Sequence, residues 1–278
     1  MNRPSLVAGD EIGGYSVLQN ISVNASESEV YVCEKSKRKY VLKYYIKEHT
    51  DIVIAGILLH CSDKNVVRFF DFGIYKNRYF EVIEYIKGGS LGDTDINGNY
   101  KYLPLNGKMV YKIIGQLNTA LNSIHNKGII HRDIKPENIL YSPMDSRVCI
   151  SDFGLSSIIS GSIGLCTVPT RARTEGYAGP EIYSFTAGFK TDYYSLGITI
   201  WRLATGLDPF VYKDQVKMSS EAIHRFTVNG DIAAMLFKRN DSLNNKLKML
   251  IENLLIVNYD ERWSYEEVCD FLQSCVIL

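Results

Sequence analysis

HRDIKPEN occupies residues 131–138 and decides the fold together with a second short motif, Asp152-Phe153-Gly154. The first motif follows apolar residues at helical spacing from Met109 to Ile124, and Gly128 stands where a helix end favours a left-handed residue. The second motif follows a short apolar strand at residues 148–151. The sequence therefore predicts an amphipathic helix, a polar loop, a strand and a second polar loop, in that order.

The composition is that of an ordinary globular protein. Among 278 residues, 31 are Lys or Arg and 31 are Asp or Glu, while 46% are hydrophobic and 22% are charged. The balanced charge gives no sign of a nucleic-acid partner, and no apolar stretch reaches the ~18 residues that a membrane span needs. The six cysteines form no CxxC pair, so we expect reduced thiols and a cytoplasmic protein.

The two parts of the chain differ in their patterns. Strands are predicted at 15–18, 30–33, 40–44, 66–72 and 79–83, and a helix at 51–60. After Gly88-Gly89 helical patterns dominate, as at 193–203, 243–255 and 265–272. We therefore expect an α+β fold in two lobes. The N-terminal lobe, residues 1–86, would hold an antiparallel sheet plus one helix, and the C-terminal lobe, residues 87–278, would be mainly helical.

Phosphoryl transfer needs positioned phosphates, metal ions that neutralise charge and a carboxylate near the attacking hydroxyl. HRDIKPEN and DFG match, in order and spacing, two motifs of the eukaryotic-type serine/threonine protein kinases, and the chain resembles that family from about residue 15 to 272. The resemblance implies a bilobal kinase fold that uses ATP and Mg²⁺, with Mn²⁺ as a substitute. It also implies that Asp133 accepts the proton of the substrate hydroxyl and that Asn138 and Asp152 bind the metal.

Lys43 is the candidate for the family's strand lysine, which binds the α- and β-phosphates of ATP. It lies in the apolar strand run before a predicted helix, with Val41 on the same face of the strand. The family pairs this lysine with a glutamate on the helix, but no glutamate stands at the corresponding position here. Asp51 is our choice of partner and Glu48 is the alternative.

The loop that covers the phosphates in the family carries three glycines, which this chain lacks. Alignment on Val30 puts Val23, Ala25 and Ser28 at those positions. Because glycine lets the backbone close over the phosphates, its loss predicts weaker ATP binding. The small side chains of Ala25 and Ser28 leave room for the nucleotide, and both remain candidate ATP-binding residues.

Residues 79–86 are similar to the family's segment that binds adenine through backbone groups. The resemblance makes the Glu84 carbonyl and the Ile86 N–H the adenine contacts, and Ile83 the residue that controls the back pocket. Val30 and Val41 would cover the purine ring from above.

Further matches distinguish protein kinases from small-molecule kinases. The segment from Thr174 to Glu181 is similar to the family's GTxxYxAPE, and the resemblance pairs Glu181 with Arg262 in a buried ion pair. It also makes Asp192 the anchor of the catalytic loop. Lys135 together with Thr174 resembles the arrangement found in serine/threonine-specific members.

Arg132 beside Asp133 implies a following loop that phosphorylation can order. The loop after the DFG motif offers four hydroxyl side chains as phosphorylation sites: Ser160, Ser162, Thr167 and Thr170. Thr167 and Thr170 lie farthest from the motif and are the preferred candidates. A homodimer that phosphorylates itself in trans is one arrangement that fits this loop.

The sequence thus predicts an active, stand-alone serine/threonine kinase of bacterial type that phosphorylates a protein substrate and itself. The alternative is a pseudokinase scaffold that binds a partner without turnover, because the glycine-rich loop is degenerate and the partner of Lys43 is open. A small-molecule kinase is a third interpretation, which Lys135, Glu181 and Arg262 disfavour.

Overall fold

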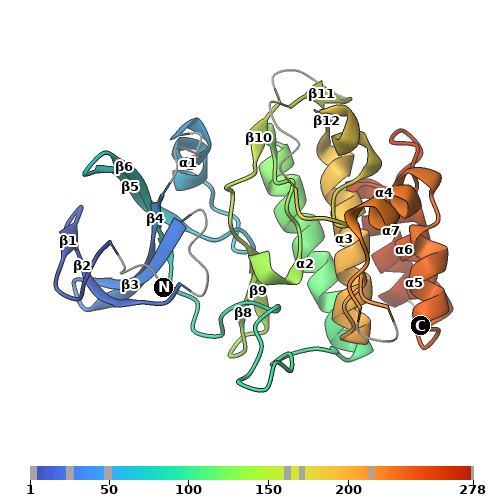
Figure 1. Ribbon diagram of the computed structural model, residues 1–278, viewed down its shortest axis with the longest axis horizontal. Coiled ribbons are helices and arrows are strands. Elements are labelled where there is room, and N and C mark those ends of the chain that lie inside the picture. Colours follow the sequence, from blue (N-terminus) through green and yellow to red (C-terminus); the bar gives the residue numbers. More distant parts are fainter. Residues whose placement is uncertain are drawn as a thin grey trace. The chain divides into compact units, whose positions relative to one another are not determined.

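The computed structural model describes residues 5–22, 28–46, 52–159, 164–168, 173–212 and 216–276. The chain divides into two compact units, Met1–Lys87 and Gly88–Leu278. Strands dominate the first unit and helices the second (Figure 1). Within the described ranges, no helix combines the length and the apolar character that crossing a bilayer would require.

The first unit is a six-stranded antiparallel sheet with one helix. Its strands lie in the order β1-β2-β3-β4-β6-β5, and α1 contacts β5. The elements are β1 (Glu11–Ile12), β2 (Tyr15–Asn20), β3 (Ser28–Lys35), β4 (Arg38–Tyr45), α1 (Ile52–Leu59), β5 (Phe69–Tyr75) and β6 (Arg78–Glu84).

One strand boundary differs from the sequence prediction. The predicted strand at 66–72 begins only at Phe69 in the structure. Val66 and Val67 are 2% and 1% exposed, so their apolar character serves core packing outside the strand. Val66 instead closes a turn, in which its backbone N–H donates to the carbonyl oxygen of Asp63 at 3.2 Å.

Alternation of side chains along the strands gives the sheet two different faces. One face carries an apolar core of buried residues: Leu6, Ile12, Tyr15, Val17, Tyr31, Cys33, Leu42, Tyr44, Phe80 and Val82. The positions between these residues point to the other face. There the register pairs Val41 with Ile83 and Lys43 with Glu81. The strand register therefore places a lysine directly opposite a carboxylate.

The second unit consists mainly of helices. They are α2 (Gly107–His125), α3 (Phe189–Thr205), α4 (Ser220–Asn229), α5 (Ile232–Arg239), α6 (Asn245–Leu254) and α7 (Tyr265–Val276). Short strands form three two-stranded pairs: β7 (Ile129–Ile130) with β10 (Ser157–Ile158), β8 (Ile139–Ser142) with β9 (Arg147–Ile150), and β11 (Cys166–Thr167) with β12 (Thr186–Ala187). Two 3-10 turns lie at Pro136–Asn138 and Pro180–Ser184.

Helix α3 is the centre of this unit. The sequence predicts a helix that is apolar nearly all round, and Tyr193, Tyr194 and Trp201 on α3 are each at most 1% exposed. The helix contacts α2 and α6, and Figure 1 shows α2 and α3 running side by side. Tyr193 donates its hydroxyl to Asn118 Oδ1 on α2 at 2.9 Å, which satisfies both buried polar groups.

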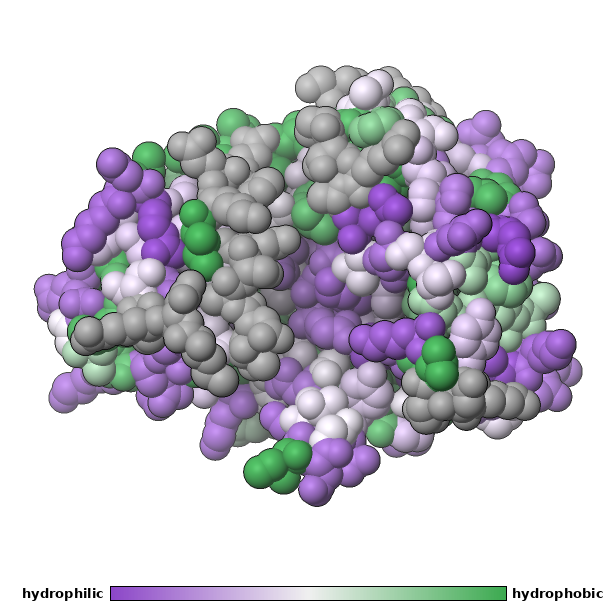
Figure 2. Space-filling model, viewed as in Figure 1, coloured by the Kyte–Doolittle hydropathy of each residue, from purple (hydrophilic) through white to green (hydrophobic). Residues whose placement is uncertain are grey.

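The face of the molecule in Figure 2 is hydrophilic over most of its described surface, with hydrophobic residues in separate small groups.

Candidate functional site

Asp133 lies at the centre of a compact polar cluster in the second unit. It is 6% exposed, and its two carboxylate oxygens have different partners. Oδ1 accepts a hydrogen bond from Thr174 Oγ1 at 2.5 Å, and Oδ2 lies 2.7 Å from Lys135 Nζ. Lys135 Nζ also donates to Thr174 Oγ1 at 2.6 Å. The structure therefore brings together the Lys135 and Thr174 pair that the sequence suggests, and both contact the proposed base.

Asn138 completes this cluster from the 3-10 turn that follows Lys135. Its Nδ2 donates to the Asp133 carbonyl oxygen at 2.8 Å and to Asp133 Oδ2 at 2.7 Å. Both amide hydrogens are thereby committed to Asp133. The amide group consequently turns its Oδ1 away from Asp133, and an amide oxygen is a suitable ligand for a hard divalent cation.

Asp192 on α3 holds the loop that carries Asp133. Its Oδ2 accepts from the backbone N–H of His131 at 2.9 Å and its Oδ1 from that of Arg132 at 2.7 Å. Oδ2 also lies 2.8 Å from His125 Nε2, and Asp192 is fully buried. These contacts confirm that Asp192 anchors the loop that carries Asp133.

Two residues in a left-handed backbone conformation flank the cluster in the sequence. Arg132 has a φ of 68° and Asp152 a φ of 67°, which is the left-handed region that residues other than glycine seldom adopt. Such conformations cluster at functional sites and persist only where surrounding contacts impose them. At Arg132 the bond from its N–H to Asp192 is one of these contacts.

His131 connects the two strained positions. It is completely buried, its ring lies 4.8 Å from that of Phe153, and its Nε2 lies 3.0 Å from the carbonyl oxygen of Ser151. Its Nδ1 accepts from the backbone N–H of Asp133 at 3.3 Å. Burial lowers the pKa of His131, against the opposing effect of nearby carboxylates such as Asp192. A neutral ring with its proton on Nε2 fits both bonds.

A buried ion pair braces the region after Thr174. Arg262 donates from Nη1 and Nη2 to Glu181 Oε1 and Oε2 at 2.8 and 3.0 Å. Arg262 also donates to the carbonyl oxygens of Ile256 and Lys190 at 2.9 and 3.0 Å. This geometry confirms the pairing that the sequence predicts.

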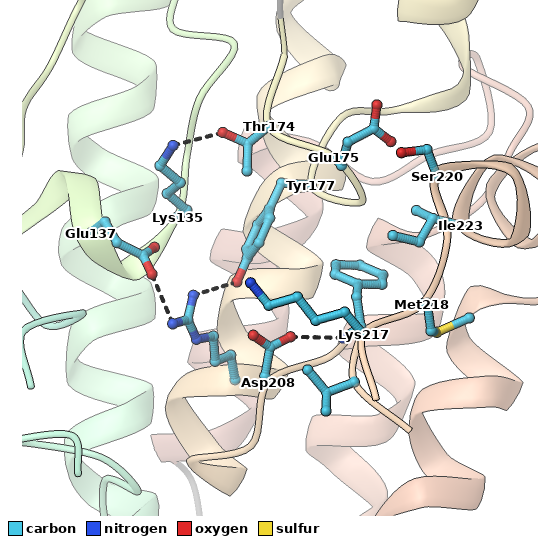
Figure 3. A pocket seen from close by; sticks show the side chains of 13 residues that line it. Lys135, Glu137, Thr174, Glu175, Tyr177, Asp208, Lys217, Met218, Ser220 and Ile223 are labelled. Atoms are coloured by element: carbon cyan, nitrogen blue, oxygen red, sulfur yellow. Dashed lines mark hydrogen bonds and ion pairs between the residues drawn. The ribbon is translucent and has the colours of Figure 1, made fainter. Parts of the chain in front are cut away.

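A pocket of about 400 Å³ opens beside Lys135 and Thr174 (Figure 3). Its lining is partly apolar, with Tyr177, Phe210, Val211, Met218 and Ile223, and partly charged, with Glu137, Glu175, Arg202, Asp208 and Lys217. The position of the pocket next to the Asp133 cluster makes it a suitable place for a peptide side chain.

Arg202 lines this pocket and pairs with Glu137, a contact that sequence reasoning misses. Arg202 Nη2 lies 2.7 Å from Glu137 Oε1, and Nη1 donates to the hydroxyl of Tyr177 at 2.8 Å (Figure 3). Arg202 is buried, which opposes its charge, but nearby Tyr177 and Glu137 more than compensate and raise its pKa. Glu137 is therefore already paired with a cation of this chain.

In the first unit, the candidate phosphate-binding lysine is buried in the sheet. Lys43 on β4 is 9% exposed, and its Nζ lies 4.0 Å from Glu81 Oε1 on β6. Val30 and Val41 lie on β3 and β4, and the backbone N–H of Val30 donates to Ser22 Oγ at 2.7 Å. Glu81 is a second residue that sequence reasoning misses, because its partner depends on strand register.

The remaining candidates fall in different places. Ser28 begins β3 opposite Tyr45, Glu84 ends β6 with its N–H bonded to the carbonyl oxygen of Arg68, and Ile86 follows at 8% exposure. Thr167 is exposed in β11. The predicted sites that lie outside the described residues are Ala25, Glu48, Asp51, Ser160, Ser162 and Thr170.

The protein kinase domain model matches residues 24–272, which is most of the chain. The chain belongs to the protein kinase family. This kinase is 31% identical over 210 residues to calcium/calmodulin-dependent protein kinase type IV of Mus musculus, covering 72% of this chain and 43% of that protein. It is 30% identical over 253 residues to serine/threonine-protein kinase DCLK1 of Rattus norvegicus, covering 84% of this chain and 53% of that protein.

Both relatives are protein kinases by name, and DCLK1 is named as a serine/threonine kinase; this kinase spans about half the length of each. Its fold is also that of a solved structure, the kinase PK-1 of the Cydia pomonella granulovirus, with a TM-score of 0.72. That comparison covers 93% of this chain and 95% of the other at 23% identity, so it establishes the kinase fold alone.

Proposed function

We propose that this chain is an active serine/threonine kinase that transfers the γ-phosphoryl group of ATP to a hydroxyl group of a protein substrate. The observation that carries the proposal is the cluster in which Lys135, Asn138 and Thr174 all contact the Asp133 carboxylate. Such a cluster orients the carboxylate, as phosphoryl transfer requires of the group that faces the attacking hydroxyl.

In the proposed reaction, the substrate hydroxyl donates its proton to an Asp133 carboxylate oxygen. A bond forms between the hydroxyl oxygen and the γ-phosphorus, and the bond from that phosphorus to the bridging oxygen of ADP breaks. Lys135 lies 2.7 Å from Asp133 Oδ2 and can also place its ammonium beside the transferring group, whose negative charge it would offset. Thr174 holds both partners through one hydroxyl.

The residues proposed to hold Mg²⁺ fit a hard cation. Asn138 presents an amide oxygen and Asp152 a carboxylate, which are the ligand types that Mg²⁺ prefers. Within the described residues no cluster of three His, Cys, Asp or Glu side chains could hold a metal. This suits an ion that binds one or two protein groups together with phosphate oxygens. When bound, the ion neutralises charge on the phosphates.

In the first unit, Lys43 is the proposed ligand of the α- and β-phosphates, with Val30 and Val41 as purine contacts and the Glu84 carbonyl and Ile86 N–H as adenine contacts. Ala25 and Ser28 keep their proposed place in the phosphate-covering loop. The surroundings of Lys43 support this role. Its ammonium is buried beside Glu81 and its backbone lies in a strand, so the side chain loses little freedom when the nucleotide binds.

Phosphorylation of the kinase by itself is a further part of the proposal. Thr167 is exposed and pairs across β11 and β12 with Thr186, so its hydroxyl is accessible to a second copy of the chain. A Thr167→Ala variant should carry fewer phosphates than the wild type after incubation with ATP.

The test is the intact mass of the purified chain after incubation with Mg²⁺ and ATP, followed by the rate of phosphate transfer to a generic basic protein. The wild type should gain phosphates and Asp133→Asn should not, with a transfer rate lower by about 10²–10⁴-fold. Asp145→Asn, at an exposed turn, is the matched control and should behave as the wild type.

Calorimetric titration with ATP separates binding from transfer in the same samples. Asp133→Asn should bind ATP as the wild type does, because Asp133 faces the hydroxyl and not the nucleotide. A wild type that binds ATP but transfers no phosphate to itself or to the basic protein would favour the pseudokinase scaffold instead.

A further inference from the structure

Lys43 and Glu81 form a pair that the sheet itself sets up. They are direct partners in the register of the antiparallel strands β4 and β6, so their side chains leave the same face at neighbouring positions. Lys43 Nζ lies 4.0 Å from Glu81 Oε1, with Lys43 9% and Glu81 2% exposed. A carboxylate buried this deeply needs a charged or hydrogen-bonding partner, and the lysine is one.

A second contact orients the Glu81 carboxylate. The hydroxyl of Tyr45 donates to Glu81 Oε1 at 2.8 Å, and Tyr45 stands two positions after Lys43 on the same strand and face. The ring of Tyr79, next to Tyr45 at 5.4 Å, packs in the same region. Lys43, Tyr45 and Glu81 thus form a cluster built wholly on strands, which hold side chains more rigidly than loops do.

Protein kinases require a carboxylate beside the strand lysine, and in the family a glutamate on the neighbouring helix supplies it. In this chain the described helix α1, Ile52–Leu59, contains no acidic residue. We infer that Glu81 on β6 positions the ammonium of Lys43 for the phosphates, as a carboxylate supplied by the sheet. This inference rests on the proposed kinase function and concerns the same site.

The strand origin of this pair has a regulatory consequence. A helix carboxylate pairs with the lysine only when the helix is correctly placed, so helix movement can switch such kinases on and off. The Glu81 pair depends on the hydrogen-bonded register of β4 and β6 and persists wherever α1 lies. The strand register therefore keeps Glu81 beside Lys43 without any contribution from α1.

Glu81→Gln tests the inference, because the amide keeps the size of the side chain and an acceptor for Tyr45 but loses the charge. We expect the KM for ATP to rise and kcat/KM to fall by about 10-fold or more, as for the loss of a charged partner. Glu81→Asp should recover part of this loss. In a Lys43→Met background, Glu81→Gln should have no further effect, since the two residues act as one unit.

Glu29→Gln is the matched control. Glu29 is also a buried carboxylate in the same sheet, at 7% exposure, and pairs with Arg78 at 3.2 Å. Glu29 lies on the opposite face of the sheet from Lys43, because its register partner is Tyr44, which belongs to the apolar core. Its variant should lose stability to a similar degree, measured by the unfolding midpoint, while the KM for ATP stays unchanged.

Equal ATP kinetics for Glu81→Gln and Glu29→Gln would overturn the inference, as would a 10-fold loss in Asp51→Asn with none in Glu81→Gln. If the wild type transfers no phosphate, the proposed function fails, but calorimetric titration with ATP still tests the role of Glu81. Weaker ATP binding by Glu81→Gln than by Glu29→Gln then supports the inference, and equal ATP affinity of the two variants overturns it. If Glu81→Gln does not fold, Tyr45→Phe takes its place. Its KM for ATP and its calorimetric ATP affinity are then compared with those of Glu29→Gln.

Discussion

Arg262 and Glu181 are held together by two parallel hydrogen bonds of 2.8 and 3.0 Å, although 81 positions separate them in sequence. The Arg262 side chain is fully buried and that of Glu181 is 5% exposed. Arg262 packs under the rings of Tyr194 and Tyr259 at 5.0 and 5.7 Å. The pair therefore joins the segment after Thr174 to the loop between α6 and α7.

The first prediction is that breaking this pair destabilises the second unit strongly. Glu181→Gln leaves a buried, uncompensated guanidinium, and removal of one partner of such a pair costs about 3–5 kcal/mol. Urea unfolding should report this as a lower midpoint. The exposed pair of Lys248 and Asp241 is the control, and Lys248→Met should cost at most about 1 kcal/mol. Similar costs for both would contradict the structural role of Glu181.

The second prediction concerns the hydroxyl of Thr174, which contacts both Lys135 and Asp133. Thr174→Val keeps the shape but removes both bonds, and bonds to charged groups contribute about 1.5–3 kcal/mol. Because Thr174 is half-buried, we expect a cost at the lower end of this range, which corresponds to a fall in kcat of about 10-fold. Thr174→Ser keeps the hydroxyl and should stay within a few-fold of wild type in the same steady-state assay. Equal activity of the two variants would exclude the positioning role.

The third prediction is a dependence of stability on pH that arises from His131. Burial lowers its pKa in the folded state below the ordinary value of 6.5, so the unfolded chain binds the proton first as the pH falls. The contribution of His131 to the free energy of unfolding is present in full above pH 6.5. It is lost as the pH falls below that value, at up to about 1.4 kcal/mol per pH unit.

Urea unfolding between pH 7 and pH 5 checks this prediction. His131→Asn, whose amide does not titrate, should show a shallower loss of unfolding free energy than the wild type. His60→Gln removes an exposed histidine and should leave the wild-type slope in place. A wild-type slope in His131→Asn would assign the pH dependence to other groups.

The sequence predicts the parts of the site that lie in short motifs. HRDIKPEN and the segment after Thr174 place Lys135, Asp133 and Glu181 by local spacing, and the structure brings their partners to them. The contacts that sequence reasoning misses join residues with no local signal. Glu81 meets Lys43 through strand register, which a shift of one residue would reverse. Arg202 meets Glu137 through the packing of α3 against the catalytic loop.

The start of β5 shows a second limit of pattern reading. Val66 and Val67 resemble strand residues because they are apolar and β-branched, but burial alone produces that composition. Whether such residues join a strand depends on where the partner strand begins to bond, and the ladder between β5 and β6 starts at Phe69.

The last prediction concerns Gly176, in the turn between Thr174 and Tyr177. Its φ is +84°, and an added Cβ would lie 2.2 Å from the ring of Phe210. Gly98 has a similar φ of +81° with nothing within 4 Å of that position. Both alanine variants share a backbone strain of about 1–2 kcal/mol. Gly176→Ala alone adds overpacking of about 1–3 kcal/mol and displaces the turn beside the Asp133 cluster.

Gly176→Ala should therefore lose more unfolding free energy than Gly98→Ala and also lose phosphate transfer, which Gly98→Ala should retain. If the overlap with Phe210 is the cause, combining Gly176→Ala with Phe210→Leu should cost less than the sum of the two single variants, because the smaller side chain leaves space for the added methyl group. Strict additivity would place the effect of Gly176→Ala in its backbone conformation and not in its contact with Phe210.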